Sequence, residues 1–168
     1  PVPTGDELTV ASFNFERLFD TVNDPAIGEP VLTSTAFGNR LAKISLAMRD
    51  FLHLPDILGA IEVENLDTLK AVADRVNADS GSNPQYQAYL VEGNDVGGID
   101  VGFLVKTVSV GGNARVAVGS VTQENAGELF ANPDTSTELL NDRPPLVLEA
   151  TVNFADGRTY PITVIVVH

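Results

Sequence analysis

The chain contains no cysteine, and this absence excludes several kinds of chemistry. A disulfide framework, a metal site built on thiolates and a thiol nucleophile all need that residue. Any metal ion must therefore be held by oxygen or imidazole ligands. Long apolar runs are also missing, since no uninterrupted stretch approaches the roughly 20 residues that a membrane-spanning helix needs. We expect no membrane partner.

Basic residues are few. The sequence has 10 Lys and Arg against 23 Asp and Glu, which gives a formal net charge of −13. Such a charge repels polyanions at long range and argues against a protein that simply coats DNA. It is compatible with an enzyme that contacts phosphate through a divalent cation and a few Arg side chains, because the ion supplies the strongest local positive charge.

The length of the chain suits one domain. With 168 residues, of which 43% are hydrophobic, it can bury one sizeable core. We therefore predict a single domain over residues 1–168. An apolar strand over residues 161–167 is followed only by His168, and the first residue, Pro1, is not a methionine. Since a buried strand rarely ends a domain, we expect an incomplete domain, truncated at its C-terminal side.

Short β-rich runs alternate with two helical patterns. Apolar residues recur at spacings of three and four over residues 38–52 and again over residues 66–76, which predicts two helices with one apolar face each. The residues of these faces are Leu41, Ile44, Met48 and Phe51 in the first helix, and Leu69, Val72, Ala73 and Val76 in the second. Strands are expected over residues 8–15, 56–63, 86–92, 99–106, 114–118, 146–154 and 160–167.

The order of these elements predicts the fold class. Strand, helix, strand and helix come first, and mostly strands follow after a polar segment over residues 120–141. This order favours an α/β (α+β) fold with a mixed, mostly antiparallel sheet. We expect two helices on one face of that sheet and a second sheet on the other.

Polar residues stand where predicted strands begin or end, and strand ends hold side chains rigidly. Asn14 ends the first strand, and Glu62 ends the second, with Glu64 expected on the same face two residues later. Arg143 precedes a strand near the end of the chain, and His168 follows the last one. Chemistry is best sought at these positions.

Each of these residues also has a purely structural explanation. An Asn at a strand end is commonly a turn or cap residue, and Glu62 could begin a solvated loop. Arg143 beside an aspartate could form an exposed ion pair that contributes little to stability. His168 could lie in a solvent-exposed tail, and we take His53 as a structural or surface residue.

Taken together, however, five segments resemble in order the motifs of the endonuclease/exonuclease/phosphatase superfamily, with most similarity to bacterial extracellular nucleases. They are Ala-Ser-Phe-Asn-Phe-Glu-Arg-Leu-Phe-Asp (11–20), Leu-Pro-Asp-Ile-Leu-Gly-Ala-Ile-Glu-Val-Glu-Asn (54–65), Gly-Gly-Ile-Asp-Val-Gly-Phe-Leu-Val-Lys (97–106), Asn-Asp-Arg-Pro-Pro-Leu (141–146) and Ile-Thr-Val-Ile-Val-Val-His (162–168). Each motif is short, but their order and spacing together are specific.

The resemblance implies the N-terminal portion of a two-layer, deoxyribonuclease-like α/β sandwich that hydrolyses phosphoesters with Mg²⁺, or with another divalent cation such as Mn²⁺ or Ca²⁺. Glu62 matches the carboxylate that binds the metal, and Asn14 matches the amide at the same site. Oxygen ligands of this kind are those that Mg²⁺ prefers. His168 matches the first of two active-site histidines, and Asp100 the acid that orients it. Arg143 matches an arginine that reaches the substrate phosphate.

The sequence departs from the family pattern in two ways. Ile61 stands where many relatives carry glutamine, and the family's later motifs would lie beyond residue 168. We therefore expect a fragment with little or no activity. The missing part would supply most of the second sheet, so an apolar sheet face should be exposed, and we expect a homodimer or larger assembly that buries it.

Three functional interpretations follow. The favoured one is a nuclease with DNA or RNA as the substrate of the intact enzyme, in an extracellular or periplasmic location in bacteria. The second is a phosphatase or lipid phosphodiesterase on the same scaffold, because substrate choice lies in variable loops. The third is a non-catalytic acidic interaction module. That module predicts no divalent metal site near Glu62 and no clustering of Asn14, Glu62, Asp100, Arg143 and His168.

Overall fold

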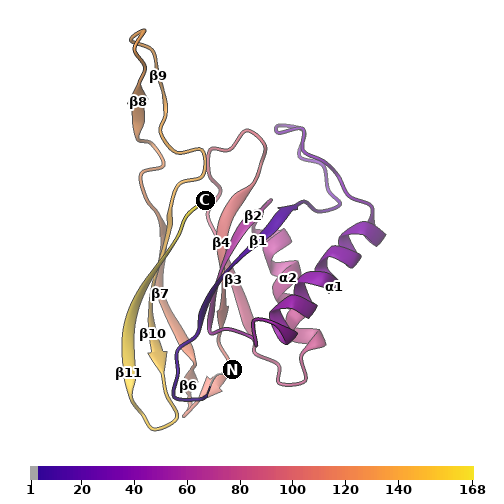
Figure 1. Ribbon diagram of the computed structural model, residues 1–168, viewed down its shortest axis with the longest axis vertical. Coiled ribbons are helices and arrows are strands. Elements are labelled where there is room, and N and C mark those ends of the chain that lie inside the picture. The colour runs from indigo at the N-terminus through magenta and orange to yellow at the C-terminus, as the bar shows by residue number, and fades with distance from the viewer. Residues whose placement is uncertain (1–3) are drawn as a thin grey trace.

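Two sheets packed face to face, with helices on the outer side of one of them, form the body of the molecule (Figure 1). The computed structural model describes residues 4–168. The expected α/β class is confirmed, as is the placement of both helices on one face of a mixed sheet. Every predicted strand overlaps an observed one.

The central sheet has the strand order β1-β2-β4-β3. Its strands are β1 (Val10–Leu18), β2 (Ile57–Val63), β3 (Tyr86–Leu90) and β4 (Asp100–Lys106). β1 and β2 are parallel, whereas β4 runs antiparallel to both of its neighbours. The parallel pair requires a crossover connection, and the first helix supplies it.

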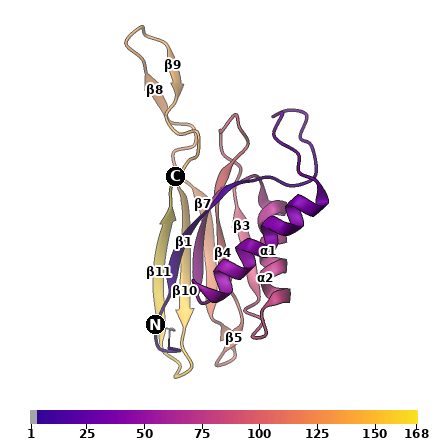
Figure 2. The same cartoon turned by 45° about the vertical axis from the view of Figure 1, so that its right-hand side comes forward.

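Helices α1 (Ser34–Asp50) and α2 (Leu66–Asp79) cover one face of this sheet (Figure 2). Each begins at a capping side chain: Thr33 accepts a hydrogen bond from the backbone nitrogen of Ala36, and Asn65 accepts one from that of Thr68. The cap at Thr33 starts α1 four residues earlier than the apolar spacing predicts. The apolar helix faces pack on the sheet in one core cluster, which includes Met48, Leu58, Leu69, Val72 and Leu104.

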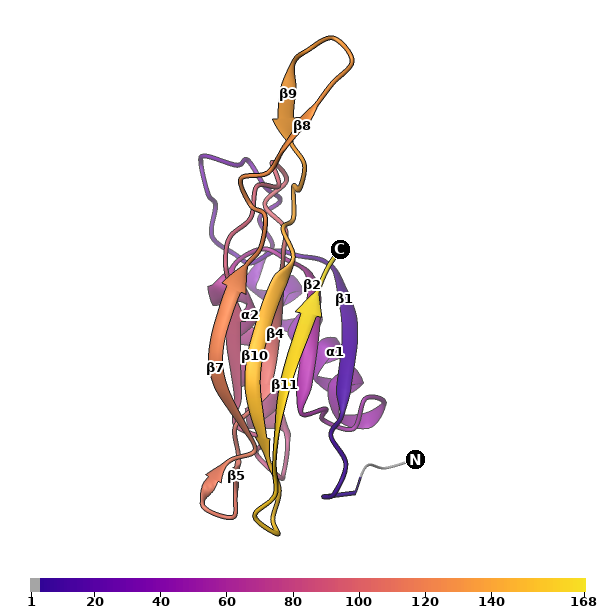
Figure 3. The same cartoon turned by 90° about the vertical axis from the view of Figure 1, so that its left-hand side faces the viewer.

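A second sheet of order β11-β10-β7 covers the other face of the central sheet (Figure 3). It consists of β7 (Val116–Gln123), β10 (Leu146–Asn153) and β11 (Thr159–Val166). Phe103 and Val105 of the central sheet pack against Leu146 and Leu148 in a second core cluster. The predicted exposed sheet face is therefore wrong over β2 and β4, because three strands already suffice to cover them.

The sandwich is not closed along the side where β1 and β11 form the edges of their sheets. β1 and β11 are both edge strands, and they flank a groove of about 360 Å³ that Val10, Ser12, Gly59 and Val164 help to line. The groove exposes apolar side chains, among them Val10 and Ile165.

Two small hairpins complete the described residues. β5 (Ser109–Val110) pairs with β6 (Asn113–Ala114), and β8 (Leu129–Ala131) pairs with β9 (Thr137–Leu139). The second hairpin lies within the predicted polar segment and projects away from the body (Figure 1). Among residues 4–168 no helix is long and apolar enough to cross a membrane.

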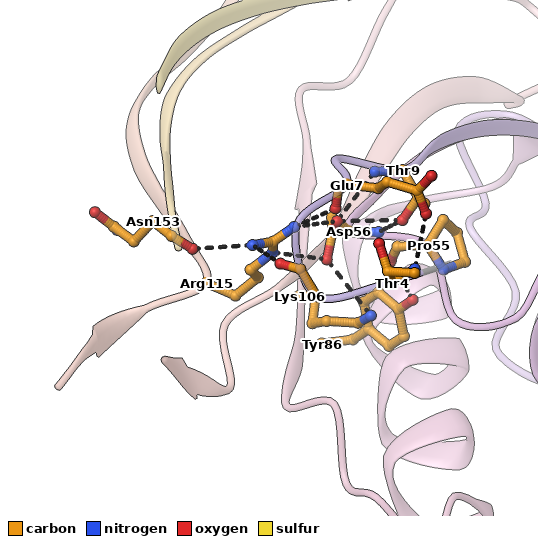
Figure 4. Close-up of polar contacts among 10 residues, drawn as sticks. Thr4, Glu7, Thr9, Pro55, Asp56, Tyr86, Lys106, Arg115 and Asn153 are labelled. Atoms are coloured by element: carbon orange, nitrogen blue, oxygen red, sulfur yellow. Dashed lines mark hydrogen bonds and ion pairs between the residues drawn. The ribbon is translucent and has the colours of Figure 1, made fainter. Parts of the chain in front are cut away.

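Arg115, just before β7, contacts Asp56 at the start of β2 and so connects the two sheets (Figure 4). Glu62 lies near the other end of β2. It is buried, and its Nε and Nη2 atoms donate to the two carboxylate oxygens of Asp56 at 3.1 and 3.0 Å. The same guanidinium donates to the backbone carbonyls of Glu7 and Asn153 at 2.5 and 3.0 Å. One side chain thus joins the N-terminal segment, the start of β2 and the end of β10.

The Asp56 carboxylate stays charged in this buried place. Burial alone would raise its pKa, but the hydrogen bonds from Arg115 and from the backbone of Thr9, with the charge of Lys106, lower the pKa overall.

Candidate active site

The strand ends that carry Asn14 and Glu62 are irregular. The pairing of β1 with β2 shifts register between Asn14 and Leu18, and that of β2 with β4 shifts between Ile61 and Val63. Glu62 has a φ of 61°, in the left-handed region that non-glycine residues rarely adopt. Irregularities of this kind re-aim side chains next to active sites. The regular alternation that would put Glu64 beside Glu62 is therefore broken.

Glu62 is the centre of the polar cluster at this end of the sandwich. Its Oε1 atom accepts hydrogen bonds from Asn14 Nδ2 and His168 Nε2, both at 3.0 Å. The hydrogen bond from Asn14, then that from His168, lowers the pKa of the Glu62 carboxyl. The side chain is only 19% exposed. Glu62 is thus ionised at neutral pH, and its two hydrogen bonds fix the orientation of the carboxylate.

The contacts of His168 define its tautomer. Arg143 Nη1 lies 2.5 Å from Nδ1 of the ring, and because arginine has no acceptor, Nδ1 must accept this hydrogen bond. Nε2 then carries the ring proton that is donated to Glu62. The imidazole ring thus lies between the Arg143 guanidinium and the Glu62 carboxylate.

Arg143 is held from its other side by Asp95, whose Oδ1 lies 3.6 Å from Nη2. This pairing replaces the exposed ion pair with the neighbouring aspartate that the sequence suggested as an alternative. Asn14, Glu62, Arg143 and His168 therefore form one connected set of hydrogen bonds.

Asp100 lies beside this set but has other partners. Its Oδ1 accepts from the backbone nitrogen of Gly93 at 2.8 Å, and among the described residues it makes no hydrogen bond to His168. The predicted orienting contact with His168 is thus not seen in this conformation. A side chain at position 93 would collide with the Asp100 carboxylate and with Pro144, so glycine permits this close approach.

The pKa of Asp100 is raised to about 7. Burial is the main cause of the rise. The hydrogen bond from Gly93 opposes it, the charges of Glu92 and Asp95 add to it, and the charge of Arg143 opposes it least. Near neutral pH this carboxyl therefore exchanges a proton easily.

A family model described as the Endonuclease/Exonuclease/phosphatase family matches residues 9–128, most of the chain. The chain belongs to this family. Its members are generally hydrolases that act on phosphodiester bonds, and they generally use divalent metals. The matched region contains Asn14, Glu62 and Asp100, whereas Arg143 and His168 follow it. No curated protein matches the chain.

The donor atoms of this family member fit a loosely held Mg²⁺ ion. Glu62 Oε2 accepts no side-chain hydrogen bond from the described residues, and the Asn14 oxygen uses one lone pair on the backbone nitrogen of Glu16, 2.7 Å away. Within residues 4–168 no group of three or more acidic or histidine ligands is arranged around a common point. Mg²⁺ commonly binds to one or two carboxylates and completes its shell with water and substrate phosphate.

The sequence reasoning missed three features of the site. Asp95 anchors Arg143, Gly93 binds Asp100, and Glu64 turns away from Glu62 to accept from the backbone of Asp20. The Gly-Asn-Asp-Val-Gly-Gly segment just before Asp100 was a usable signal, since a loop so rich in glycine next to an acidic strand end permits close backbone approach.

Proposed function

We propose that this family member is a metal-dependent phosphodiesterase acting on nucleic acid. The observation that carries the proposal is the convergence of Asn14, Glu62, Arg143 and His168 from distant parts of the sequence. Glu62 lies 48 residues from Asn14 and 106 from His168, yet it is hydrogen-bonded to both. A non-catalytic module gives no reason for such a cluster.

The residues have separate tasks. A divalent ion at Glu62 would act as a Lewis acid on the phosphate. Arg143, fixed between Asp95 and His168, offers a cationic fork whose geometry suits phosphate oxygens. His168 offers its Nε2–H group beside Glu62, from where it can donate a hydrogen bond to an oxygen of the substrate and stabilise the charge that develops there.

Turnover by this chain should be slow. Within residues 4–168 the cluster holds one carboxylate and one imidazole, so it has no second acid-base pair to activate water. A phosphatase or a lipid phosphodiesterase is the second candidate, because the family scaffold does not fix the substrate.

Metal binding is the most direct test. Calorimetric titration with Mg²⁺ should show one site, and Glu62→Gln should weaken it by at least about tenfold, the loss seen even for outer-shell changes at metal sites. Glu138→Gln, on the exposed strand β9, is the matched control and should leave binding unchanged. Equal binding by all three proteins would rule out Glu62 as the ligand.

Activity separates the two substrate classes. With Mg²⁺ we expect slow cleavage of plasmid DNA that Glu62→Gln and His168→Ala both abolish. Intact plasmid together with hydrolysis of p-nitrophenyl phosphate would instead favour the phosphatase. Inactivity on both, with no Mg²⁺ binding, would favour the interaction module.

A further inference from the structure

A cavity of about 530 Å³ adjoins the candidate active site between β1 and α1. Asn14 belongs to both, because it lines the cavity and also donates to Glu62. The other residues that matter here are Phe13 and Phe15 of β1, and Arg40 and Lys43 of α1. A substrate bound at Glu62 could therefore extend past Asn14 into this cavity.

The guanidinium of Arg40 is fixed by one of its nitrogen atoms, and its other two nitrogen atoms can bind a ligand. Its Nη2 atom donates to the backbone carbonyls of Phe15 and Glu16 at 2.7 and 2.6 Å. Nε and Nη1 make no hydrogen bond within residues 4–168. A guanidinium that is already ordered loses little conformational entropy when it binds an anion.

Lys43 lies three residues further along α1, on the same side of the helix. It is exposed, and it forms no ion pair with the part of the chain that the structure describes. The cavity wall thus carries two cations against a single carboxylate, Glu16, in a chain whose net charge is −13. This local excess of positive charge is unusual for the molecule and suits a phosphate group.

The remaining lining is apolar, with Ile44, the buried Phe15 and the partly exposed Phe13. Phe13 and Phe15 contact each other edge to face, with ring centroids 5.3 Å apart. Aromatic side chains next to cations are the combination that binds single-stranded nucleic acid, since bases stack on the rings while phosphates contact the cations. A cavity of this size also falls in the range of small-ligand sites.

We propose that this cavity binds the nucleotide next to the one whose phosphate is hydrolysed, with Arg40 and Lys43 at the neighbouring phosphate and Phe13 at the base or sugar. The proposal rests on the proposed function and narrows it, because a polynucleotide carries a neighbouring phosphate on every internal nucleotide. A substrate with a single phosphate would leave Arg40 and Lys43 without an anionic partner.

The test measures binding of a fluorescent, hydrolysis-resistant phosphorothioate oligonucleotide over a series of salt concentrations. One lost phosphate contact to a single strand should make the slope of log affinity against log salt shallower by about 0.7. We expect this change, with weaker binding, for Lys43→Gln. Lys70→Gln is the matched control, since Lys70 is another exposed lysine, on α2, and within residues 4–168 it pairs only with Asp67. Lys43 is exposed, so its substitution should not disturb folding.

Equal slopes for the wild type and Lys43→Gln would overturn the subsite. Hydrolysis of bis(p-nitrophenyl) phosphate, which has a single phosphate, tests the proposed function separately. If Glu62→Gln abolishes that hydrolysis while Lys43→Gln leaves oligonucleotide binding unchanged, the phosphodiesterase function is supported and the proposed nucleotide site in the cavity is refuted. A mononucleotide that binds as tightly as the oligonucleotide would also contradict the subsite.

Discussion

Asp100 is the residue whose charge should shape the pH dependence of stability. Its ordinary pKa is 3.8, and burial raises it to about 7. Between these pH values the folded state binds more protons than the unfolded state, so the free energy of unfolding falls as pH rises. Above about pH 7 this loss is complete.

Replacement of Asp100 by asparagine should remove this dependence, because an amide cannot ionise yet can still accept from Gly93. We expect the change in unfolding free energy between pH 4 and pH 7 to differ from that of the wild type by a few kcal/mol, about 1.4 kcal/mol for each unit of pKa shift as an upper bound. Urea unfolding at several pH values measures it, with the exposed Asp50→Asn as control. Parallel curves for Asp100→Asn and the wild type would contradict the prediction.

For individual residues, the sequence could predict which side chains form the candidate site, but not the backbone geometry that brings them together. The order and spacing of the motifs led to Asn14, Glu62, Arg143 and His168, which the structure brings together. The left-handed backbone at Glu62 depends on how β2 pairs with its two neighbouring strands, so the residues next to Glu62 in the sequence do not predict it.

Elements with a clear apolar period were predictable, and those without one were not. Both helices were found from the spacing of their apolar residues, and β2 and β4 from unbroken apolar runs. Hairpin β8–β9 was missed because all of its strand residues are exposed, which leaves no alternation to detect. β7 extends to Gln123, beyond its predicted end, since pairing with β10 continues it.

Arg115 shows how elements depend on one another. It is buried against Asp56, and removing one partner of a buried, hydrogen-bonded ion pair commonly costs about 3–5 kcal/mol. We expect Arg115→Met to reduce the free energy of unfolding by about this amount, because Asp56 keeps only the more distant Lys106 as a cationic partner and two carbonyls lose their donor.

Chemical denaturation measures the effect, and Arg158→Met is the matched control. Arg158 lies over the same Phe154 ring as Arg115, but its side chain is 62% exposed. Exposed ion pairs contribute at most about 1 kcal/mol, so this control should change little. A similar loss for both variants would mean that the buried pair has no special role.

At the scale of the whole molecule, the open side of the sandwich favours self-association. Edge strands with exposed apolar side chains pair readily with another chain, and Ile165 on β11 is 59% exposed. We propose that a second copy pairs along β11. Light scattering after size-exclusion chromatography should show a dimer at high protein concentration.

A charge at the edge should oppose this pairing. Ile165→Lys should therefore shift the protein toward the monomer. Leu129→Lys should not, since Leu129 is exposed on β8, in the hairpin that projects away from the body. A wild-type protein that stays monomeric at every concentration would refute the dimer.

The wide sequence separation of the cluster around Glu62 has a consequence for folding order. Asn14 and Glu62 meet only after the α1 crossover has closed, and His168 reaches Glu62 only after both sheets have docked. Partly folded chains therefore lack the proposed ion-binding arrangement. A ligand that binds only the native state stabilises that state as a whole. A divalent ion bound at Glu62 would therefore raise the free energy of global unfolding, and it would not stabilise any single segment by itself.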